Sequence, residues 1–284
     1  MPAAGHAPDA PSGWRPSPAI AASAGLHAAA LAALAAAPAT WPWAAGAIAC
    51  NHALLAAAGL LPRSRLLGPN LTRLDSADPL AARAVALTFD DGPDAEVTPR
   101  VLDRLERAGA RATFFCVGRA VRRQPRLARQ IVERGHAVEN HSDAHSIGFG
   151  FYGWRRLGRD IDAAQAAIEQ ATGLRPRYFR APFGMRSPLL EPALAQRGLR
   201  LASWTTRGFD TTAASAAVAA GRLTRALAPG QILLLHDGVA TGRRGRADAL
   251  AVLDDVLEAV ATLRLRTVTL REQADRVAQA APAR

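Results

Sequence analysis

The sequence predicts an α/β protein, a distorted (β/α)7-type barrel preceded by an apolar helical hairpin. From Arg83 onward, short runs rich in β-branched and aromatic residues alternate with segments of helical periodicity, which is typical of parallel βα units. Residues 16–62 contain no Asp, Glu, Lys or Arg, whereas charged residues are frequent after Arg83. With 284 residues, 49% hydrophobic and 21% charged, the chain is long enough for one large domain with an appendage.

The uncharged segment divides into two apolar stretches, 17–37 and 41–61, each long enough to cross the hydrocarbon core of a bilayer as a helix. Prolines supply a turn between them, two tryptophans lie at that turn, and arginines follow the second stretch. We therefore expect a flexible tail over 1–16, a transmembrane hairpin over 17–62 and a linker over 63–82. Because arginine is retained on the cytoplasmic side, we expect the inner (cytoplasmic) membrane, with the domain that follows facing the cytoplasm.

Two alternatives to the membrane hairpin follow from its composition. The first stretch is mostly alanine, and the polar residues His27, Asn51 and His52 interrupt the pair, so a soluble helical pair packed on the main domain remains open. A cleaved signal peptide is disfavoured, since a single arginine precedes the apolar residues and the apolar stretch is about twice too long.

The barrel domain is expected over residues 83–280. Its predicted strands are 84–89, 112–117, 136–140, 178–180, 199–204, 232–235 and 267–270. Helical spacing of apolar residues predicts helices over 99–108, around 127–132, over 157–168 and over 250–260. Seven strands with about six or seven helices in about 200 residues suit a barrel slightly smaller than the eight-stranded one.

The formal net charge is +11 at pH 7, and all 35 basic residues are arginine. They are spread in pairs over the predicted helices and form no single basic block interleaved with aromatics, so a nucleic-acid partner is not expected. An anionic lipid or an anionic substrate is favoured instead. Cys50 and Cys116 lie far apart in apolar runs, which excludes a disulfide framework, and Cys116 is expected as a buried small hydrophobe.

Polar residues follow the predicted strands where a parallel barrel places reactive side chains. Asp90 and Asp91 follow the first strand, and adjacent carboxylates raise each other's pKa unless a cation lies between them. His141 and His145, at i and i+4, follow the third strand and are expected on one side of a helical turn. Together with Asp91 they make a two-histidine, one-carboxylate set, as in a hydrolytic metal site with an open position.

Zinc suits this ligand set best, while cobalt, manganese, nickel and iron are not excluded by ligand type. The alternative is a plain Asp-Asp-Gly-Pro turn beside two surface histidines. The Asp-Asp turn alone, or the histidine pair alone, is equally compatible with that alternative. The two together favour the metal site.

Four motifs stand in order along the chain. They are Thr88-Phe89-Asp90-Asp91-Gly92-Pro93, His141-Ser142-Asp143-Ala144-His145, Arg180-Ala181-Pro182-Phe183-Gly184 and Leu234-Leu235-His236. The chain thereby resembles the NodB-homology polysaccharide deacetylases, the fourth carbohydrate esterase family. The resemblance covers residues 83–272 and leaves the amino-terminal segment outside it.

The resemblance implies roles for the motif residues. Asp91, His141 and His145 would hold the metal. Asp90 would be the general base that takes a proton from water, and His236 would be the general acid that protonates the leaving amine.

Three further residues would complete the site by the same resemblance, and a fourth, Trp204, is a candidate from its residue type. Arg180 would pair with the general base and orient it, and the backbone N–H near Phe183 would help to stabilise the oxyanion. Leu234 would line the pocket for the acyl methyl group. Trp204 is a candidate platform for stacking a sugar, with core packing as the equal alternative.

One motif departs from the family pattern, which usually shows an acidic residue, two further positions and then Asp-Trp. Here Arg207 stands at the acidic position, Asp210 is retained, and Thr211 replaces the tryptophan. Asp210 is expected to hydrogen-bond His236 and raise its pKa. Arg207 changes the wall of the groove and favours contact with an anionic group such as phosphate.

The predicted function is that of a metal-dependent hydrolase. It would remove an N-acyl group, acetyl above all, from an amino sugar in a polysaccharide, a glycolipid or a lipid-linked precursor. A sugar O-deacetylase or deformylase of the same fold is one alternative, since the chemistry is shared. A catalytically silent glycan-binding or assembly protein is the other, although the base, the three ligands and the acid are all present.

Overall fold

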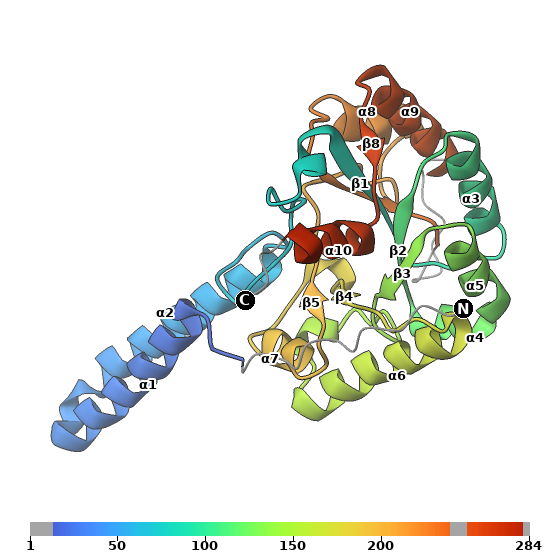
Figure 1. Cartoon of the computed structure of the whole chain (residues 1–284). Helices are drawn as coiled ribbons and strands as arrows, with labels where there is room; N and C mark the ends of the chain where they lie inside the picture. The colour runs from blue at the N-terminus through green and yellow to red at the C-terminus, as the bar shows by residue number, and fades with distance from the viewer. Residues whose placement is uncertain (1–13, 239–248, 281–284) are drawn as a thin grey trace.

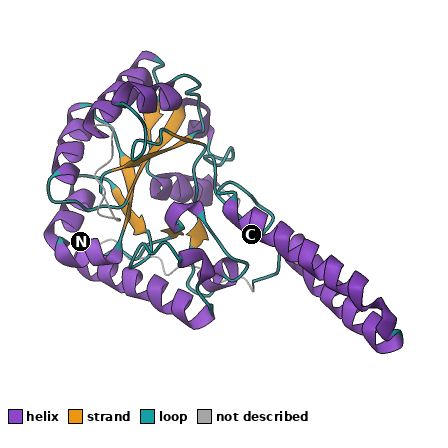
Figure 2. Ribbon diagram, turned by 180° about the vertical axis from the view of Figure 1, so that it is seen from behind, coloured by secondary structure: helices purple, strands orange, loops and turns teal. Residues whose placement is uncertain are grey.

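A computed structural model describes residues 14–238 and 249–280. A curled, parallel β-sheet lies at its centre, helices cover the outside of the sheet, and two long helices project away from the domain (Figure 1). The view from behind shows the same arrangement, with the strands enclosed by helices and the helical pair standing clear of them (Figure 2). The expected α/β barrel architecture is confirmed as a curled sheet.

Eight strands are found in the described part of the chain. They are β1 Ala84–Asp90, β2 Ala112–Cys116, β3 Ala137–Asn140, β4 Tyr178–Phe179, β5 Arg200–Leu201, β6 Thr206–Arg207, β7 Ile232–His236 and β8 Arg266–Thr267. Their order is β5-β4-β3-β2-β1-β7-β6, with β8 paired to β1, and every pair is parallel. The carboxyl ends of the strands therefore meet at one edge of the sheet.

Two of the predicted strands were wrong in extent and one strand was missed. The strand predicted over 199–204 is only Arg200–Leu201, and β6 follows it separately. The strand predicted over 267–270 ends at Thr267, because Thr269 and Glu272 form a reciprocal capping box that starts the next helix. In that box the Thr269 backbone N–H donates to Glu272 Oε2, and the Glu272 N–H donates to Thr269 Oγ1, both at 3.0 Å.

The helices alternate with the strands. They are α1 Pro18–Ala36, α2 Trp41–Leu60, α3 Val97–Arg107, α4 Gly118–Arg123, α5 Pro125–Glu133, α6 Trp154–Thr172, α7 Leu190–Ala195, α8 Ala216–Thr224, α9 Ala249–Thr262 and α10 Leu270–Ala280. The helices predicted from periodicity are confirmed in α3, α5, α6 and α9. The short helices α4, α7 and α8 and the terminal α10 were not predicted.

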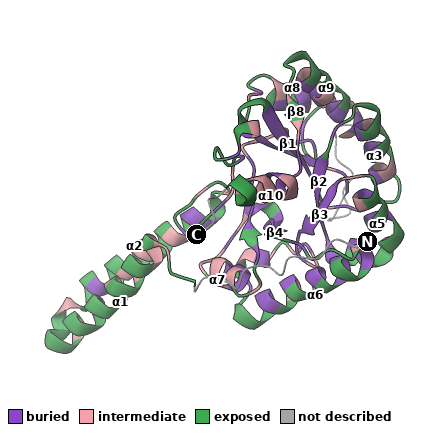
Figure 3. Ribbon diagram, in the orientation of Figure 1, coloured by how far each residue is buried: buried purple, intermediate pink, exposed green. Residues whose placement is uncertain are grey.

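Alternation along the strands divides the core into two parts. Val85, Leu87 and Phe89 of β1 belong to the outer cluster between sheet and helices, whereas Ala84 and Ala86 belong to the inner cluster. The same alternation continues in the sequence to Thr88 and Asp90 on the inner side, since side chains two apart share a face. Figure 3 shows the strands buried and the outward helix faces exposed.

The segment expected as a linker, 63–82, runs along the sheet in part. The backbone N–H of Leu71 donates to Leu201 O at 3.0 Å, and the Ser203 N–H donates back to Leu71 O at 2.8 Å. The Leu74 N–H donates to Gly230 O at 2.8 Å, just before β7. Residues 71–74 thus bridge the edge at β5 and the start of β7.

The projecting helices α1 and α2 are long and apolar enough to cross a membrane by length and composition, with mean hydropathy of 1.7 over Pro18–Ala36 and 1.4 over Pro38–Leu60. Only 11% and 17% of these stretches is buried, so the pair is not packed along the sheet domain (Figure 3). The polar interruptions face each other across the pair: His27 Nε2 lies 3.1 Å from His52 Nε2, and Asn51 Nδ2 donates to Ser23 Oγ at 2.8 Å.

Candidate active site

The candidate site begins at the turn that follows β1. Asp90 ends the strand on its inner face, and Asp91 adopts a positive φ of 76° that turns the chain at once into Gly92. A side chain on Gly92 would collide with the carboxylate of Asp237, which lies directly after β7. This close approach requires glycine and holds the two neighbouring strand ends together.

Asp91, His141 and His145 converge at this edge of the sheet, and their ligand atoms all lie within 4.8 Å of one another. Asp91 Oδ1 lies 3.4 Å from His141 Nε2 and 3.2 Å from His145 Nε2. The Nδ1 atom of His141 lies 2.9 Å from the backbone oxygen of Arg180, which orients Nε2 toward Asp91.

The segment that carries the two histidines is not the expected helical turn. The stretch from His141 to His145 is irregular, with positive φ angles of 66° at Ser142 and 46° at His145. The Asn140 side chain accepts from the Ser142 N–H at 2.9 Å, and the Ser142 hydroxyl accepts from the His145 N–H at 2.9 Å. Local side-chain hydrogen bonds, not helical spacing, therefore bring the imidazoles together.

A divalent cation fits these three residues. Asp91 Oδ1 and His145 Nδ1 are buried atoms without a hydrogen-bond partner among the described residues. One carboxylate and two imidazoles, with no fourth protein ligand in the group, form the donor set of an open hydrolytic metal site.

The protonation of Asp91 and His145 also suits a cation, whereas the carboxylates of Asp90 and Asp91 raise the pKa of His141 against the effect of its burial. Burial alone would raise the pKa of Asp91, but the adjacent His141 and the other nearby histidines lower it to about 2. Burial and the neighbouring His141 lower the pKa of His145 to about 4. Both groups are therefore in the deprotonated, ligating form at neutral pH.

Arg180 holds Asp90 from the inner side of the sheet. Its Nη1 donates to Asp90 Oδ1 at 2.7 Å and to Thr88 Oγ1 at 2.8 Å, and its Nη2 donates to Ser203 O at 2.7 Å. The guanidinium carbon lies 3.9 Å from the centre of the Phe115 ring. The second carboxylate oxygen, Asp90 Oδ2, lies 3.7 Å from His141 Nε2 and points to the three-residue group.

His236 lies at the end of β7, next to β1, and is oriented by Asp210. His236 Nδ1 lies 2.8 Å from Asp210 Oδ1, and the His236 backbone N–H donates to Asp210 Oδ2 at 2.8 Å. Burial alone would lower the pKa of His236, but the Asp210 carboxylate and, more weakly, Asp91 and Asp90 raise it to about 9. The imidazole is thus cationic at neutral pH, as expected from the sequence.

The remaining candidates lie around this group with different exposures. Phe183 has a positive φ of 58°, is 41% exposed, and lies with its ring centre 4.7 Å from that of His145. Leu234 and Trp204 are 2% and 5% exposed and belong to the inner core cluster. The structure therefore favours core packing for Trp204 over sugar stacking, which requires an uncovered ring. Arg207 is half-buried and lies over the Phe209 ring.

Several supporting residues surround the motifs, of which the sequence predicted only Ser142, as a residue that caps the histidine segment. Thr88 donates to Leu233 O at 2.7 Å while it accepts from Arg180, and Asn140 and Ser142 shape the histidine segment. Asp237 has no assigned role in the proposed reaction. It is buried, its carboxylate accepts a hydrogen bond from Thr98 Oγ1 at 2.6 Å, and burial raises its pKa to about 7. Their adjacency to the motifs was the only signal, since short polar residues are common at strand ends.

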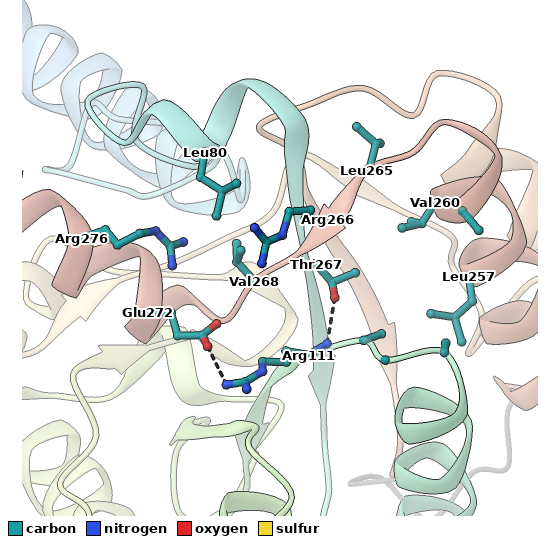
Figure 4. A pocket seen from close by; sticks show the side chains of 14 residues that line it. Leu80, Arg111, Leu257, Val260, Leu265, Arg266, Thr267, Val268, Glu272 and Arg276 are labelled. Atoms are coloured by element: carbon teal, nitrogen blue, oxygen red, sulfur yellow. Dashed lines mark hydrogen bonds and ion pairs between the residues drawn. The ribbon is translucent and has the colours of Figure 1, made fainter.

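A cavity elsewhere in the molecule is separate from this group. It lies between α9, β8 and α10, and Arg266, Arg276 and the paired side chains of Arg111 and Glu272 line it (Figure 4). It contains none of the motif residues, because β8 pairs with the amino-terminal start of β1 and the motifs follow the carboxyl ends.

Comparison with known proteins places the chain in a family. A profile described as "Polysaccharide deacetylase" matches residues 77–202. The chain is 35% identical over 185 residues to a chitooligosaccharide deacetylase of Azorhizobium caulinodans, covering 62% of this chain and 88% of that protein. It is 29% identical over 189 residues to a peptidoglycan-N-acetylglucosamine deacetylase of Bacillus cereus, covering 66% of each.

Solved structures of polysaccharide deacetylases have a fold similar to that of this chain. A family 4 carbohydrate esterase from Streptomyces lividans in complex with acetate superposes with a TM-score of 0.59 at 31% identity, covering 65% of this chain and 91% of that one. A CE4 family pseudoenzyme from Bacillus anthracis shares the fold, with a TM-score of 0.61 at 22% identity over 73% of this chain and 69% of that one. The chain belongs to the polysaccharide deacetylase family, the fourth carbohydrate esterase family.

Proposed function

We propose that this protein is a metal-dependent hydrolase that removes an N-acetyl group from an amino sugar. The observation that carries the proposal is the convergence of Asp91, His141 and His145, with Asp90 and His236 beside them, at one edge of the sheet. Relatives named as chitooligosaccharide and peptidoglycan-N-acetylglucosamine deacetylases support the reaction class.

Asp91, His141 and His145 would hold the divalent ion, with zinc as the preferred metal and cobalt, manganese, nickel or iron as alternatives. When bound, such an ion supplies Lewis acidity toward a water and toward the acyl carbonyl. The chain's own residues would do the remaining work of proton transfer and positioning.

Asp90 would act as the general base. Its Oδ1 is held by Arg180, so Oδ2 is the oxygen left to accept a proton from the attacking water. His236 would act as the general acid, because Asp210 keeps it protonated at neutral pH and fixes its Nδ1, leaving Nε2 to donate to the leaving amine.

Two further positions would hold the acyl group. The left-handed backbone at Phe183 presents an N–H group at the rim beside His145, where an oxyanion would form. Leu234, two residues before His236 on the inner face of β7, would form the apolar floor for the acetyl methyl.

The projecting helices would anchor the protein in the inner membrane. The arginines that follow α2 support a cytoplasmic position of the catalytic domain. A glycolipid or a lipid-linked precursor would then be the natural substrate, since a cell-wall polymer lies across the membrane from such a domain. The opposite topology would restore a polysaccharide as the substrate.

The test is acetate release by the full chain, purified in detergent and loaded with zinc, cobalt or manganese. The substrates are a chitin oligomer and a lipid-linked N-acetylhexosamine, and Asp90→Asn is the paired variant. We expect release by the wild type and loss in Asp90→Asn with metal still bound. Equal yields from both proteins, or metal binding without acetate release from either substrate, would overturn N-deacetylation.

A further inference from the structure

Three arginines gather around one short segment beside the site. The guanidinium carbon of Arg207 lies 3.7 Å from the centre of the Phe209 ring, and that of Arg222 on α8 lies 5.3 Å from it. Arg222 Nη1 also donates to Gly208 O at 3.3 Å. Arg63 reaches the same segment from the other side, where its Nη1 donates to Thr205 O at 2.8 Å.

None of the three arginines forms an ion pair within 4.0 Å in the described part of the chain, and the Asp210 carboxylate acts on the charge of Arg207 only from a longer distance. The nearest acidic residue, Asp210, has both oxygens engaged by His236. This differs from Arg197, for example, which pairs with Asp162 at 2.7 Å. The three arginines thus leave net positive charge at this place.

Arg207 differs from the exposed, unpaired arginines of the helices. It is half-buried, with its guanidinium carbon 3.7 Å from the centre of the Phe209 ring and 5.6 Å from that of the Trp204 ring. Burial lowers the pKa of its guanidinium, although the charge is retained at neutral pH. A partly desolvated guanidinium packed against aromatic rings loses less freedom on binding a ligand than an exposed one.

Arg207 lies on the strand next to the one that carries the proposed acid. Arg207 on β6 pairs in register with Leu234 on β7, and His236 follows two residues later, a rise of about 7 Å along the strand. Asp210, which orients His236, follows Arg207 by three residues. Arg207 and the proposed acid therefore lie near the same edge of the sheet, on neighbouring strands.

The cluster also lies at the base of the projecting helices. The Arg186 N–H donates to Gly59 O at the end of α2 at 3.0 Å, and the Ser203 hydroxyl donates to Pro62 O at 2.7 Å. Arg63, directly after this joint, is one of the three arginines. The cluster therefore lies between the apolar helices and the carboxyl ends of the strands.

We infer that Arg207, flanked by Arg222 and Arg63, forms a subsite for a phosphate group that the substrate carries next to its N-acetylated sugar. The planar guanidinium fork matches two phosphate oxygens, and phosphate is the anion found between a sugar and a lipid as well as on a soluble sugar. The inference rests on the proposed deacetylation and names the class of its substrate.

Binding is measured first, because it does not depend on turnover. The full-length His141→Ala variant, in which the metal set is broken, is titrated with N-acetylglucosamine 1-phosphate and with inorganic phosphate, followed by phosphorus NMR. We expect affinity to fall roughly 10- to 100-fold on adding Arg207→Gln, the loss of a charged hydrogen-bond pair, and to recover in part with Arg207→Lys. Arg225→Gln, at an exposed position just after α8, is the control and should change nothing.

Turnover then separates the sources of the phosphate. In the wild-type background, Arg207→Gln should raise KM for N-acetylglucosamine 1-phosphate, for a polyprenyl-phosphate-linked N-acetylglucosamine, or for both. The rise should be roughly tenfold or more beyond any change in KM for neutral chitotriose. An effect confined to the lipid-linked substrate assigns the phosphate to a lipid carrier.

Three results would overturn the subsite. The first is a phosphate affinity that is the same with and without Arg207. The second is an equal effect of Arg207→Gln on the KM for the neutral and for the phosphorylated substrate. The third is that Arg207→Gln weakens binding to phosphatidylglycerol vesicles but leaves the affinity for the soluble phosphate unchanged. If the wild type deacetylates nothing, the proposed function fails, while the titration of the His141→Ala protein still decides the subsite.

Discussion

Arg180 and Asp90 form an ion pair inside the sheet, with Nη1 and Oδ1 2.7 Å apart and side chains only 1% and 5% exposed. The guanidinium also donates to the Thr88 hydroxyl and to two backbone carbonyl oxygens, so each of its three nitrogens makes at least one hydrogen bond. The pair leaves a single carboxylate oxygen of Asp90 facing the metal group. The Arg180–Asp90 ion pair therefore stabilises the fold and also orients Asp90, the proposed base.

Replacing Arg180 by Met should be strongly destabilising, because Asp90 would remain buried without a cation. We expect a loss of about 3–5 kcal/mol in the free energy of unfolding, measured by denaturant titration. Arg197→Met is the matched control at the Arg197–Asp162 pair, where the Asp162 side chain is 58% exposed, and it should cost under about 1 kcal/mol. Equal losses in the two variants would contradict the structural role of the buried pair.

Asp90→Asn separates catalysis from stability at the same contact. The amide keeps the size of the carboxylate but cannot accept the proton of water as a base does. Activity should fall about 100- to 10,000-fold while bound metal stays near the wild-type level. Metal analysis by plasma mass spectrometry beside the acetate assay checks this, and lost metal would show that Asp90 is a ligand.

His141→Ala should remove the metal and the activity together, because one of three ligands is lost. A chelator should do the same to the wild type, and added zinc should restore the rate. His136→Gln is the control: His136 is buried and its Nδ1 accepts from the Ala112 N–H at 3.2 Å, outside the metal group. That variant should lose stability and keep its metal.

The rate should fall on the alkaline side as His236 loses its proton. With its pKa raised to about 9, the imidazole donates a proton below that pH and cannot donate above it. Asp210→Asn removes the main cause of the raised pKa and leaves burial, which lowers it, so the alkaline limb should move to lower pH. Rate profiles of both proteins at the same metal loading test this, and coincident limbs would exclude His236 as the acid.

Gly59 joins α2 to the loop after β4, and it tolerates no side chain. A Cβ at this position would collide with the carbonyl oxygen of Arg186, whereas a Cβ on Gly46, in the same helix, meets nothing within 4 Å. Gly59→Ala should loosen the joint and speed hydrogen exchange at Arg186. Gly46→Ala should be neutral or stabilise the helix by up to about 1 kcal/mol, and a similar response of both variants would contradict the joint.

The projecting helices should decide where the protein partitions. A chain beginning at residue 58 keeps the Gly59 contact but lacks both apolar stretches, so it should leave the membrane fraction on ultracentrifugation. Its activity on a soluble substrate should remain within about twofold once circular dichroism shows an intact fold. Retention of the shortened chain in the membrane pellet would assign membrane binding to the catalytic domain.

Much of the fold follows from local patterns in the chain. Apolar spacing in 99–108 and 157–168 predicts α3 and α6, because a helix must bury one face wherever it packs. The lack of charge over 16–62 predicts two apolar helices for a different reason, because each apolar stretch is long enough to cross a bilayer as a helix. Asp90, Asp91, His141 and His236 were expected near one another because parallel strands bring their carboxyl ends to one edge.

Other features depend on which distant segments meet. The two-residue strand β6 and the bridge at residues 71–74 are defined by backbone hydrogen bonds to partners far along the chain, which no local pattern encodes. The helical turn expected between His141 and His145 is replaced by hydrogen bonds from Asn140 and Ser142. The burial of Trp204 and the absence of an ion pair at Arg207 likewise depend on tertiary packing. The type of a side chain determines which partners it can accept, but only the tertiary structure determines which partners lie beside it.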